Sequence, residues 1–313
     1  MLLIVTNRRD LTADWLIGEL HRRDAPFVRF NTEDYPAEVT LRWSPEAGAT
    51  LRLSDRELAL SDVTAVWYRR PVPPSLDARY EQPRAEWARD EAMEALDAVL
   101  RTIRGVWVNH PDQNRAASLK SAQLEAAREL GFRVPQTVIT NDPDAARELV
   151  ANARDGAIVK PVRQGRIRRD GYDELFFTSE ITDSDALDRL GAEPYVFQEL
   201  IHKTADIRVT VIGDSVLPVR IDSQRDPRAR VDFRRVDPAE LAHEPMQLDP
   251  EAAARCRGLV SRFGCLFGAI DLLETMEGEL VFLENNPNGQ WAWLEQRCEV
   301  PLRSRLADLL LAK

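Results

Sequence analysis

The chain has 313 residues, 44% hydrophobic and 30% charged, which is typical of a folded globular protein of roughly two domains. Its 42 Lys and Arg against 52 Asp and Glu give a net charge of -10, which argues against a general nucleic-acid-binding protein. The opening apolar run is too short for a signal peptide, and no stretch approaches the ~20 apolar residues of a membrane span. We therefore expect a cytoplasmic protein without nucleic-acid or membrane partners.

The cysteine and histidine patterns exclude two further classes. The three cysteines, Cys256, Cys265 and Cys298, form no CxxC pair and no even disulfide framework, which fits a reducing compartment. The four histidines are scattered and show no HExxH spacing, so zinc hydrolysis is not indicated. Any metal site must therefore be built from carboxylates.

Residues 1–110 are predicted to form an α/β lobe, because strand-like apolar runs alternate with helical patterns. The expected elements are a buried strand LLIVT at 2–6, a helix from Leu11 to about Arg23, several short strands, a strand TAVWYRR at 64–70 and a helix at about 84–101. The strand at 64–70 ends at the helix- and strand-breaking cluster PVPP at 71–74. We expect the lobe to end near His110.

Residues 111–195 are predicted to form a small α+β unit. The expected elements are a helix from Pro111 through Leu130 stopped by Gly131, strands PQTVIT at 135–140 and AIVKP at 157–161 with a helix between them, and a helix at 183–190. The segment 163–177 reads as a mobile loop that contains Arg163, Arg166, Arg168 and Arg169. It is either a basic lid or an ordinary solvated charge run.

The strand YVFQELI at 195–201 leads into residues 196–313, which contain two hairpins with visible turns. The first is DIRVTVI-GD-SVLPVRI at 206–221, and the second is FGAIDLLETM-EG-ELVFLENN at 267–286, with a helix from about Pro250 to Phe263 between them. We expect no linker or repeat in this part of the chain.

The second hairpin carries the most informative acids. A two-residue turn at Glu277-Gly278 pairs Thr275 with Leu280 and Leu273 with Phe282, and it places Asp271 opposite Glu284 with Asn286 on the same face. Opposed like charges are destabilising unless a cation lies between them, and hard oxygen ligands suit Mg²⁺. The alternative is a strand end whose acids are merely solvated.

Phosphate binding must rest on lysines, because the chain has neither GxxxxGK[ST] nor GxGxxG. Lys120, inside a predicted helix, and Lys160, at the end of AIVK, are the candidates, although a single lysine is most often a surface residue. Phe197 and Leu200 could form one wall of an adenine slot, and the backbone near Gln198, Glu199, Leu200 and Ile201 could read the base. The alternative for that strand is plain core packing.

Two Asp-x-Arg pairs suggest fixed guanidinium forks. Asp206 and Arg208 lie two apart on one strand, as Asp232 and Arg234 may, so each pair shares a face. An arginine held by a nearby aspartate suits a carboxylate or phosphate ligand, whereas the alternative is a structural ion pair. A turn at Gly213-Asp214 places Arg220 on the opposite face from Arg208.

Together these motifs resemble the ATP-grasp ligases over about residues 110–290. The order is Lys120, VPQTVIT, Lys160-Pro161, VFQELI, DIRVTVIGD, GAIDLL and LENNPNG. Within that superfamily, VWYRRP at 66–71, VDFRR at 231–235 and ENNPNGQWAWLE at 284–295 resemble the graspetide synthetases, which are microviridin-type peptide maturases. One departure is the basic segment after Lys160, where many ATP-grasp enzymes have a Gly-rich loop.

The resemblance implies an α/β ATP-grasp fold with a Rossmann-like pre-ATP-grasp lobe at 1–110, a central lid subdomain at 111–195 and a C-terminal subdomain at 196–313. It implies a homodimeric ligase that uses ATP and Mg²⁺ to join Asp or Glu side chains of a ribosomal precursor peptide to Ser, Thr or Lys side chains. Lys120 and Lys160 would hold phosphates, Gln198, Glu199, Leu200 and Ile201 adenine, and Asp271, Glu284 and Asn286 metal, while Asp206, Arg208 and Arg234 would serve catalysis.

Two alternatives stay open at the level of sequence. The first is a carboxylate–amine ligase of the RimK or glutathione synthetase type, which would use the same chemistry on small molecules or free amino acids. The second is a nucleotide-binding regulatory or scaffold protein that has lost catalysis.

Overall fold

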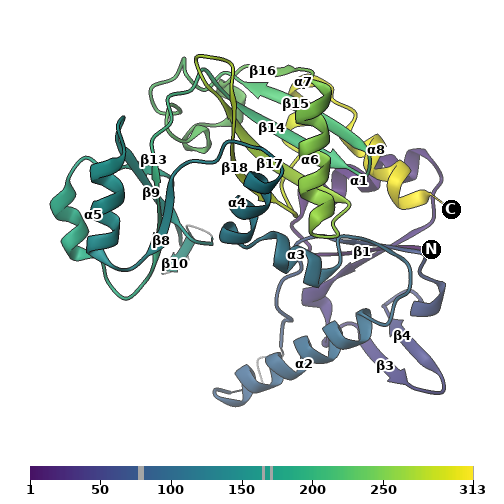
Figure 1. The fold of residues 1–313 in the computed structure, drawn as a ribbon. Helices are drawn as coiled ribbons and strands as arrows, with labels where there is room; N and C mark the ends of the chain where they lie inside the picture. Colours follow the sequence, from purple (N-terminus) through teal and green to yellow (C-terminus); the bar gives the residue numbers. More distant parts are fainter. Residues whose placement is uncertain (77–80, 164–165, 170–171, 313) are drawn as a thin grey trace.

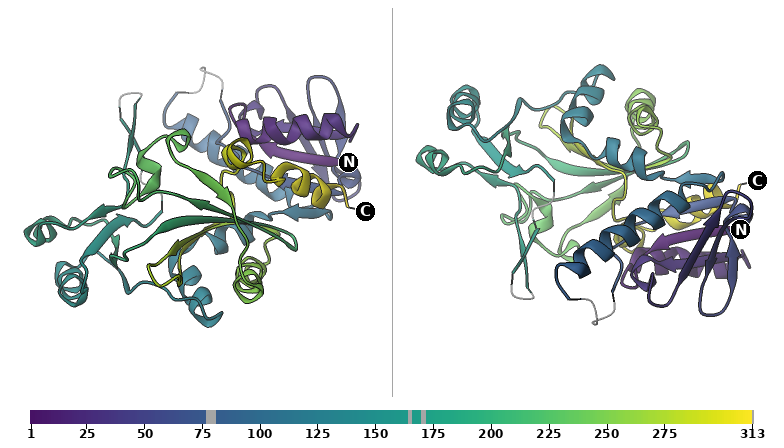
Figure 2. Two further views of the ribbon diagram at one scale, coloured as in Figure 1. Left: turned by 90° about the horizontal axis from the view of Figure 1, so that it is seen from above. Right: turned by 90° about the horizontal axis from the view of Figure 1, so that it is seen from below.

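The computed structural model describes residues 1–76, 81–163, 166–169 and 172–312. An N-terminal lobe and a small lid lie at opposite ends of a C-terminal sheet, and both chain termini lie at the N-terminal lobe (Figure 1). The two further views in Figure 2 show the same separation of lid and lobe. Among the described helices, none has both the length and the apolar character needed to cross a membrane.

The N-terminal lobe is built on a parallel sheet with the strand order β2-β1-β6-β7. These strands are β1 (Leu2–Thr6), β2 (Phe27–Asn31), β6 (Ala65–Tyr68) and β7 (Val106–Val108), with helices α1 (Leu11–Arg22) and α2 (Arg84–Leu100). A separate antiparallel sheet contains β3 (Thr40–Ser44), β4 (Gly48–Arg52) and β5 (Glu57–Ala59). Every residue of β1 is buried, because the two faces of the parallel sheet pack into two different core clusters.

The predicted single helix at 111–130 is instead two helices, α3 (Pro111–Ala117) and α4 (Lys120–Glu129). Ser118 donates a hydrogen bond to the carbonyl of Asn114 (2.6 Å), and Leu119 has an extended backbone that separates the helices. Lys120 therefore begins a helix rather than lying inside one. Gly131 ends α4 with a φ of 85°, as its position predicted.

The lid is an antiparallel sheet of strand order β12-β9-β13-β8 covered by α5 (Pro143–Asn152). Its strands are β8 (Thr137–Thr140), β9 (Ala157–Pro161), β12 (Ser179–Glu180) and β13 (Tyr195–Glu199). Where the sequence predicted a loop, the backbone forms the paired strands β10 (Arg166–Arg169) and β11 (Tyr172–Leu175). Side chains at 164–175 lie outside the described part of the chain, so the basic-lid interpretation stays a prediction.

The C-terminal sheet is antiparallel, with the order β16-β15-β14-β17-β18. Its elements are β14 (Ala205–Ile212), β15 (Ser215–Ile221), β16 (His243–Pro245), β17 (Phe267–Glu274) and β18 (Leu280–Asn286), with helices α6 (Pro250–Arg262), α7 (Ala292–Cys298) and α8 (Leu302–Leu311). The side chain of Asp249 accepts a hydrogen bond from the Ala252 N–H (2.8 Å) and Pro250 follows it, which is why α6 begins there.

We propose the division 1–110, 111–195 and 196–313 as a description of three units, although β13 (Tyr195–Glu199), which pairs with β8 and β9 of the lid, crosses the second boundary. Ala117, Ala126, Ala127 and Phe132 belong to the core cluster between the C-terminal sheet and α6. Side chains of α7 and α8 belong to a core cluster with β1 and α1 of the N-terminal lobe. The lobe and the C-terminal sheet are therefore joined by a shared core, and the lid proper begins near β8.

Asn109 joins the N-terminal lobe to the C-terminal sheet. Its buried amide donates through Nδ2 to the side chain of Asn114 (3.1 Å) and to the carbonyls of Phe267 (2.9 Å) and Pro287 (3.0 Å). Its Oδ1 accepts from the N–H groups of Leu266 (2.9 Å) and Phe267 (3.0 Å). One side chain thus satisfies several buried backbone groups beside the start of β17.

Asn109→Ala is expected to lower the free energy of unfolding by about 3 kcal/mol, because it leaves buried N–H and C=O groups without partners. Urea denaturation followed by circular dichroism measures this change. Asn152→Ala, at the exposed end of α5, is the matched control and should stay within about 0.5 kcal/mol of the parent. An equal effect of the two variants would contradict the role of Asn109.

Candidate active site

Asp271 and Glu284 lie opposite each other on β17 and β18, as the sequence predicted, but through a different register. The turn spans three residues rather than two: the Thr275 N–H donates to the carbonyl of Glu279 (2.9 Å), and Gly278 has a φ of 80°. Strand pairing is therefore shifted by one residue near the turn.

The predicted pairs of Thr275 with Leu280 and Leu273 with Phe282 are accordingly wrong, and Leu272 pairs with Phe282 instead. A β-bulge between Asp271 and Leu272 then takes up one extra residue of β18 and restores the register at the acids. Such bulges re-aim side chains next to active sites, and this one places the Glu284 carboxylate on the face of Asp271.

Cations surround the acid pair. Lys120 donates to Glu284 Oε2 (2.6 Å), and Arg208 donates to Asp271 Oδ1 (2.6 Å). Burial raises the pKa of Asp271 to about 6, and the nearby charge of Glu284 adds to that shift while Arg208 opposes it. Burial also disfavours ionised Glu284, but Lys120, Lys160 and Arg234 outweigh it and hold the pKa of that carboxyl below its usual value.

The amide of Asn286 completes the acid group. Its Nδ2 donates to Glu284 Oε1 (3.1 Å) and lies 3.4 Å from Asp271 Oδ2, so the amide contacts both carboxylates. No group of three or more His, Cys, Asp or Glu side chains suited to a metal occurs in the described ranges. Two carboxylates fit Mg²⁺, which takes few protein ligands and obtains the rest from phosphate and water, and Asn286 would add its amide oxygen once its Nδ2 turns away from the carboxylates.

A cavity beside the acid pair runs between the lid and the C-terminal sheet. Its polar and charged lining includes Lys160, Gln198, Glu199, Lys203, Asp206, Arg230, Asp232, Arg234, Asp271 and Glu284. Its apolar lining includes Pro135, Ile158, Leu200, Ile201, Phe233, Leu273 and Leu283. The cavity therefore joins an apolar slot to a cationic end, which suits a nucleotide base and its phosphates.

The hydrogen bonds of β13 refine the predicted adenine site. The N–H of Glu199 donates to the carbonyl of Gln136 (3.0 Å) and the N–H of Leu200 donates to that of Gly156 (2.8 Å). Within the described chain the next N–H, at Ile201, has no backbone partner. Phe197 does not line the cavity, because its side chain points into the lid core with Ala146 and Leu187.

Asp206 and Arg208 share a face but do not pair with each other. Asp206 accepts instead from Lys203, whose Nζ lies 2.7 Å from Oδ2, and Arg208 reaches across to β17. Burial raises the pKa of Asp206, and the adjacent ammonium of Lys203 opposes that shift. The predicted role of Asp206 as the fixing group of Arg208 is therefore wrong, and its contact holds Lys203 at the cavity wall.

Asp232 and Arg234 do pair, although they lie at a short 3₁₀ helix, Phe233–Arg235, and not on a strand. Arg234 donates Nε to Oδ1 and Nη2 to Oδ2 of Asp232 (2.8 Å each), a bidentate fork. Asp232 also accepts from the Thr178 N–H of the lid (3.1 Å), and Arg234 Nη1 lies 3.8 Å from Glu284 Oε1. The fork thus lies between the lid and the acid pair.

Two site residues were missed by sequence reasoning. Lys203 lines the cavity, but no motif singles it out in the sequence, although only four lysines occur in the chain. Gln123 is buried in α4; it donates to the carbonyl of Asn285 (2.7 Å) and accepts from the same residue's N–H (3.0 Å). It fixes the strand residue between Glu284 and Asn286, and only the folded pairing of α4 with β18 could reveal this.

The lowered pKa of Lys160 predicts that nucleotide binding depends on pH. Burial first, and then the charge of Lys120, lower its pKa to about 8, and its Nζ has no hydrogen-bond partner in the described structure. Below that pH the ammonium can bind phosphate, so kcat/KM for ATP should fall as pH rises through 8, by up to about tenfold per unit.

Initial rates between pH 7 and 9.5 measure this profile. Because the folded pKa lies below the unfolded value, loss of the proton does not destabilise the fold in this window. Lys160→Arg keeps its charge and should lack the step near pH 8. A step that persists in that variant would assign the titration to another group.

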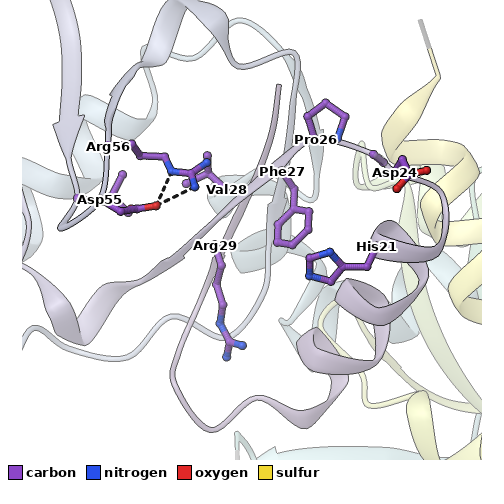
Figure 3. A pocket seen from close by; sticks show the side chains of 10 residues that line it. His21, Asp24, Pro26, Phe27, Val28, Arg29, Asp55 and Arg56 are labelled. Atoms are coloured by element: carbon purple, nitrogen blue, oxygen red, sulfur yellow. Dashed lines mark hydrogen bonds and ion pairs between the residues drawn. The ribbon is translucent and has the colours of Figure 1, made fainter.

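A second cavity, of about 440 Å³, lies on the N-terminal lobe between the end of α1 and β2 (Figure 3). The His21 ring packs against Phe27 with centroids 5.2 Å apart, and Arg56 is paired with Asp55. Arg29 of its lining donates to Asn31 (2.8 Å). Its charged lining is thus largely paired within the lobe, and no acid pair comparable to Asp271 and Glu284 lines it.

The chain is similar to several ligases that were solved with bound peptides. Residues 1–115 match the family model described as the MvdD pre-ATP grasp domain. The macrocyclase MdnC from Microcystis aeruginosa MRC, solved with the precursor peptide MdnA, is 27% identical with a TM-score of 0.87, covering 99% of each chain. No curated protein matches.

Two further solved structures are similar over the whole chain. A RiPP-associated ATP-grasp ligase from Chryseobacterium gregarium, in complex with ADP and a leader and core peptide, is 26% identical with a TM-score of 0.90, covering 99% of this chain and 96% of that one. The ATP-grasp ligase PsnB, complexed with a phosphomimetic variant of minimal precursor, Mg and ADP, is 26% identical with a TM-score of 0.78, covering 99% and 97%.

The cavity between the lid sheet and the C-terminal sheet, together with these similarities, defines an ATP-grasp ligase, an enzyme that uses ATP to form a bond. Within that superfamily the chain is similar to the solved peptide macrocyclases over its whole length, and the predicted α/β ATP-grasp fold is confirmed. The predicted site residues lie together at one cavity and its rim, while their individual roles remain predictions.

Proposed function

We propose that this enzyme closes rings in a ribosomally made precursor peptide by activating Asp or Glu side chains with ATP. A side-chain carboxylate attacks the γ-phosphorus and ADP leaves, which gives an acyl phosphate. A Ser or Thr hydroxyl, or a Lys amine, then attacks the acyl carbon, and phosphate leaves as the ester or amide forms. The proton of the attacking group departs with the phosphate, so each ring releases the equivalent of one water.

The observation that carries this proposal is the acid pair at the end of the nucleotide cavity. Asp271 and Glu284 are opposed on neighbouring strands and each is ion-paired at 2.6 Å, to Arg208 and Lys120. Such a concentration of opposite charges, next to an apolar slot, suits a triphosphate whose charge must be neutralised during phosphoryl transfer.

Each residue of the site receives a role under this proposal. Asp271, Glu284 and Asn286 would hold Mg²⁺, which supplies charge neutralisation for the transferring phosphoryl group. Lys120 and Lys160 bind phosphate oxygens, and Lys203, held by Asp206, adds a further cation at the cavity wall. Leu200 and Ile201 line the base slot, where the N–H of Ile201 donates to adenine.

Arg208 and Arg234 are proposed to position the acceptor acid. Arg208 uses one terminal nitrogen for Asp271, and its buried Nε has no partner in the described structure. Arg234 is fixed by both oxygens of Asp232 and stands near Glu284. Two oriented guanidinium groups beside the metal ligands can hold a carboxylate against the γ-phosphate, which replaces a bimolecular encounter by a fixed geometry.

The partner and setting are also proposals. Solved relatives carry precursor peptides, ADP and Mg, which supports a peptide substrate and the use of ATP with Mg²⁺ here. The resemblance further suggests a homodimer in the cytoplasm. Light scattering coupled to size-exclusion chromatography tests the dimer, and a mass equal to one chain would contradict it.

The proposed function is tested with purified enzyme, ATP, Mg²⁺ and a precursor peptide that has a leader segment and a core rich in Thr and in Asp or Glu. Mass spectrometry should show products lighter by one water per ring, together with ADP. Addition of free amino acids, with a gain of mass, would instead identify a carboxylate–amine ligase of the RimK type. Absence of any ATP turnover with either substrate would favour a regulatory protein.

A further inference from the structure

The chain leaves β6 at the topological switch point of the N-terminal sheet. From β1 the chain passes to β2 on one side and later to β6 on the other, and all these strands are parallel. In open α/β sheets, ligands bind in the crevice outside the carboxyl ends of the two strands at such a point. Asn7 follows β1 there, and Arg69 and Arg70 follow β6.

Arg70 has a backbone conformation that arginine rarely adopts. Its φ is 47°, in the left-handed region, and it precedes Pro71, before which an extended conformation is preferred. Its carbonyl accepts a hydrogen bond from Asn7 Nδ2 (2.7 Å), which holds the turn across the switch point. Glycine would adopt this turn at lower cost, and strained residues of this kind cluster at ligand clamps.

The two arginines of the turn differ in what they contact. Arg69 is fully buried; it donates to the carbonyl of Asn288 and to Gln290 Oε1 (2.8 Å), and lies 3.6 Å from Asp10. Arg70 is exposed, and its only side-chain contact is a long one, from Nε to the carbonyl of Asn288 (3.4 Å). No acceptor among the described residues meets its two terminal nitrogens.

Arg70 stands beside the catalytic site but outside the nucleotide cavity. Asn288 follows the proposed metal ligand Asn286 by two residues, so the contact places the guanidinium next to the metal-binding loop. Although part of the Arg70 side chain is exposed to solvent, surrounding protein atoms desolvate its guanidinium, and this desolvation lowers its pKa; Asp10 opposes the shift and Arg208 adds to it. Because the charges of Arg70 and Arg208 disfavour each other, an anion bound between the two guanidinium groups would be stabilised by both.

We infer that Arg70 binds a carboxylate of the substrate peptide and presents it to Arg208 at the metal site. The terminal nitrogens of arginine form a fork that matches a carboxylate. Nucleotide phosphates meet the lysines of the other wall, so the peptide is the source of this anion. The inference deepens the proposed function and rests on it: the N-terminal lobe supplies a subsite for the acidic core.

The test uses a synthetic 12-residue peptide of alternating Thr and Asp, and the same peptide with Asn in place of Asp, both with Mg-ADP present. Calorimetry should show that the parent enzyme prefers the Asp peptide. Arg70→Asn, which tolerates the left-handed backbone, should reduce that preference at least about tenfold. Arg70→Lys should reduce it less, because it keeps the charge and loses the fork.

Arg305→Met is the matched control, because Arg305 is exposed on α8 and has no side-chain partner in the described structure. It should leave the preference unchanged. An unchanged preference in Arg70→Asn, no preference in the parent enzyme, or a rise in the KM for ATP with peptide binding intact would each overturn the inference. Thermal unfolding confirms that the variants are folded.

The inference and the proposed function can fail separately. If the parent enzyme binds the Asp peptide through Arg70 but closes no ring in the precursor peptide, the carboxylate subsite stands and the macrocyclase proposal fails. If rings form at the parent rate and KM in Arg70→Asn, the function stands and the subsite is wrong.

Discussion

Replacing Asp271 by asparagine is expected to reduce ring formation and ATP turnover by at least about 100-fold while the fold is retained. The substitution conserves shape but removes one of the two carboxylates that would hold the metal. Burial and Glu284 raise the pKa of Asp271 to about 6, so Asp271 is still mostly ionised at neutral pH, but its ionised form is less stable in the folded metal-free enzyme than in the unfolded chain. The midpoint of thermal unfolding should therefore not fall greatly, even though Arg208 loses its ion pair.

Two measurements separate this loss from unfolding. Circular dichroism should match the parent, and the rise in unfolding temperature that Mg-ATP produces in the parent should be much smaller in Asp271→Asn. Asp214→Asn, in the exposed turn of the neighbouring hairpin, is the matched control and should keep full activity. Normal ATP turnover by Asp271→Asn would refute the metal-site assignment.

The acid pair shows how sequence reasoning can reach a correct contact through wrong steps. The sequence supplied the alternation and the Glu-Gly turn, but a three-residue loop around Gly278 shifted the register by one, and a bulge beside Asp271 shifted it back. Loop type and bulge depend on backbone geometry that neighbouring strands impose. Two local errors therefore cancelled at the position that matters for chemistry.

The Asp-x-Arg pairs show the limit of spacing arguments. Residues two apart on a strand share a face but lie about 7 Å apart, whereas residues opposed on neighbouring strands lie about 5 Å apart. Arg208 therefore reaches Asp271, its partner across β14 and β17, and Asp206 is left to Lys203. Asp232 and Arg234 pair only because a 3₁₀ turn shortens their separation.

The elements themselves were easier to predict than the contacts between them. Helices at 84–100 and 250–262 and the first hairpin turn at Gly213-Asp214 follow from local pattern and capping. The break at Ser118 and Leu119 could not be predicted, because both flanking segments favour helix and tertiary packing decides. That break lets Lys120 begin α4 beside Glu284, so a functional contact depends on it.

Replacing Arg208 by methionine is expected to lower kcat by about 100- to 1,000-fold, with a smaller effect on the KM for ATP. Arg208 is buried, ion-paired to Asp271 at 2.6 Å, and has an unpartnered Nε, so it can orient a carboxylate where the phosphoryl group is transferred. Arg208→Lys should recover only part of the rate, because an ammonium cannot form two parallel hydrogen bonds. Steady-state kinetics with varied peptide and ATP measure both effects.

The pH dependence of the rate is a second, independent measurement on Arg208→Met. Arg208 lowers the pKa of Asp271, so its removal should raise that pKa further and shift the acidic limb of the rate profile to higher pH. Arg220→Met is the matched control: Arg220 lies on the same hairpin, faces the other side of the sheet and is paired with Glu274 (3.1 Å). It removes the same charge nearby and should change neither kcat nor the profile. If both variants shift the acidic limb of the rate profile equally, the shift comes from the loss of one positive charge near the site and not from the Arg208 contact with Asp271.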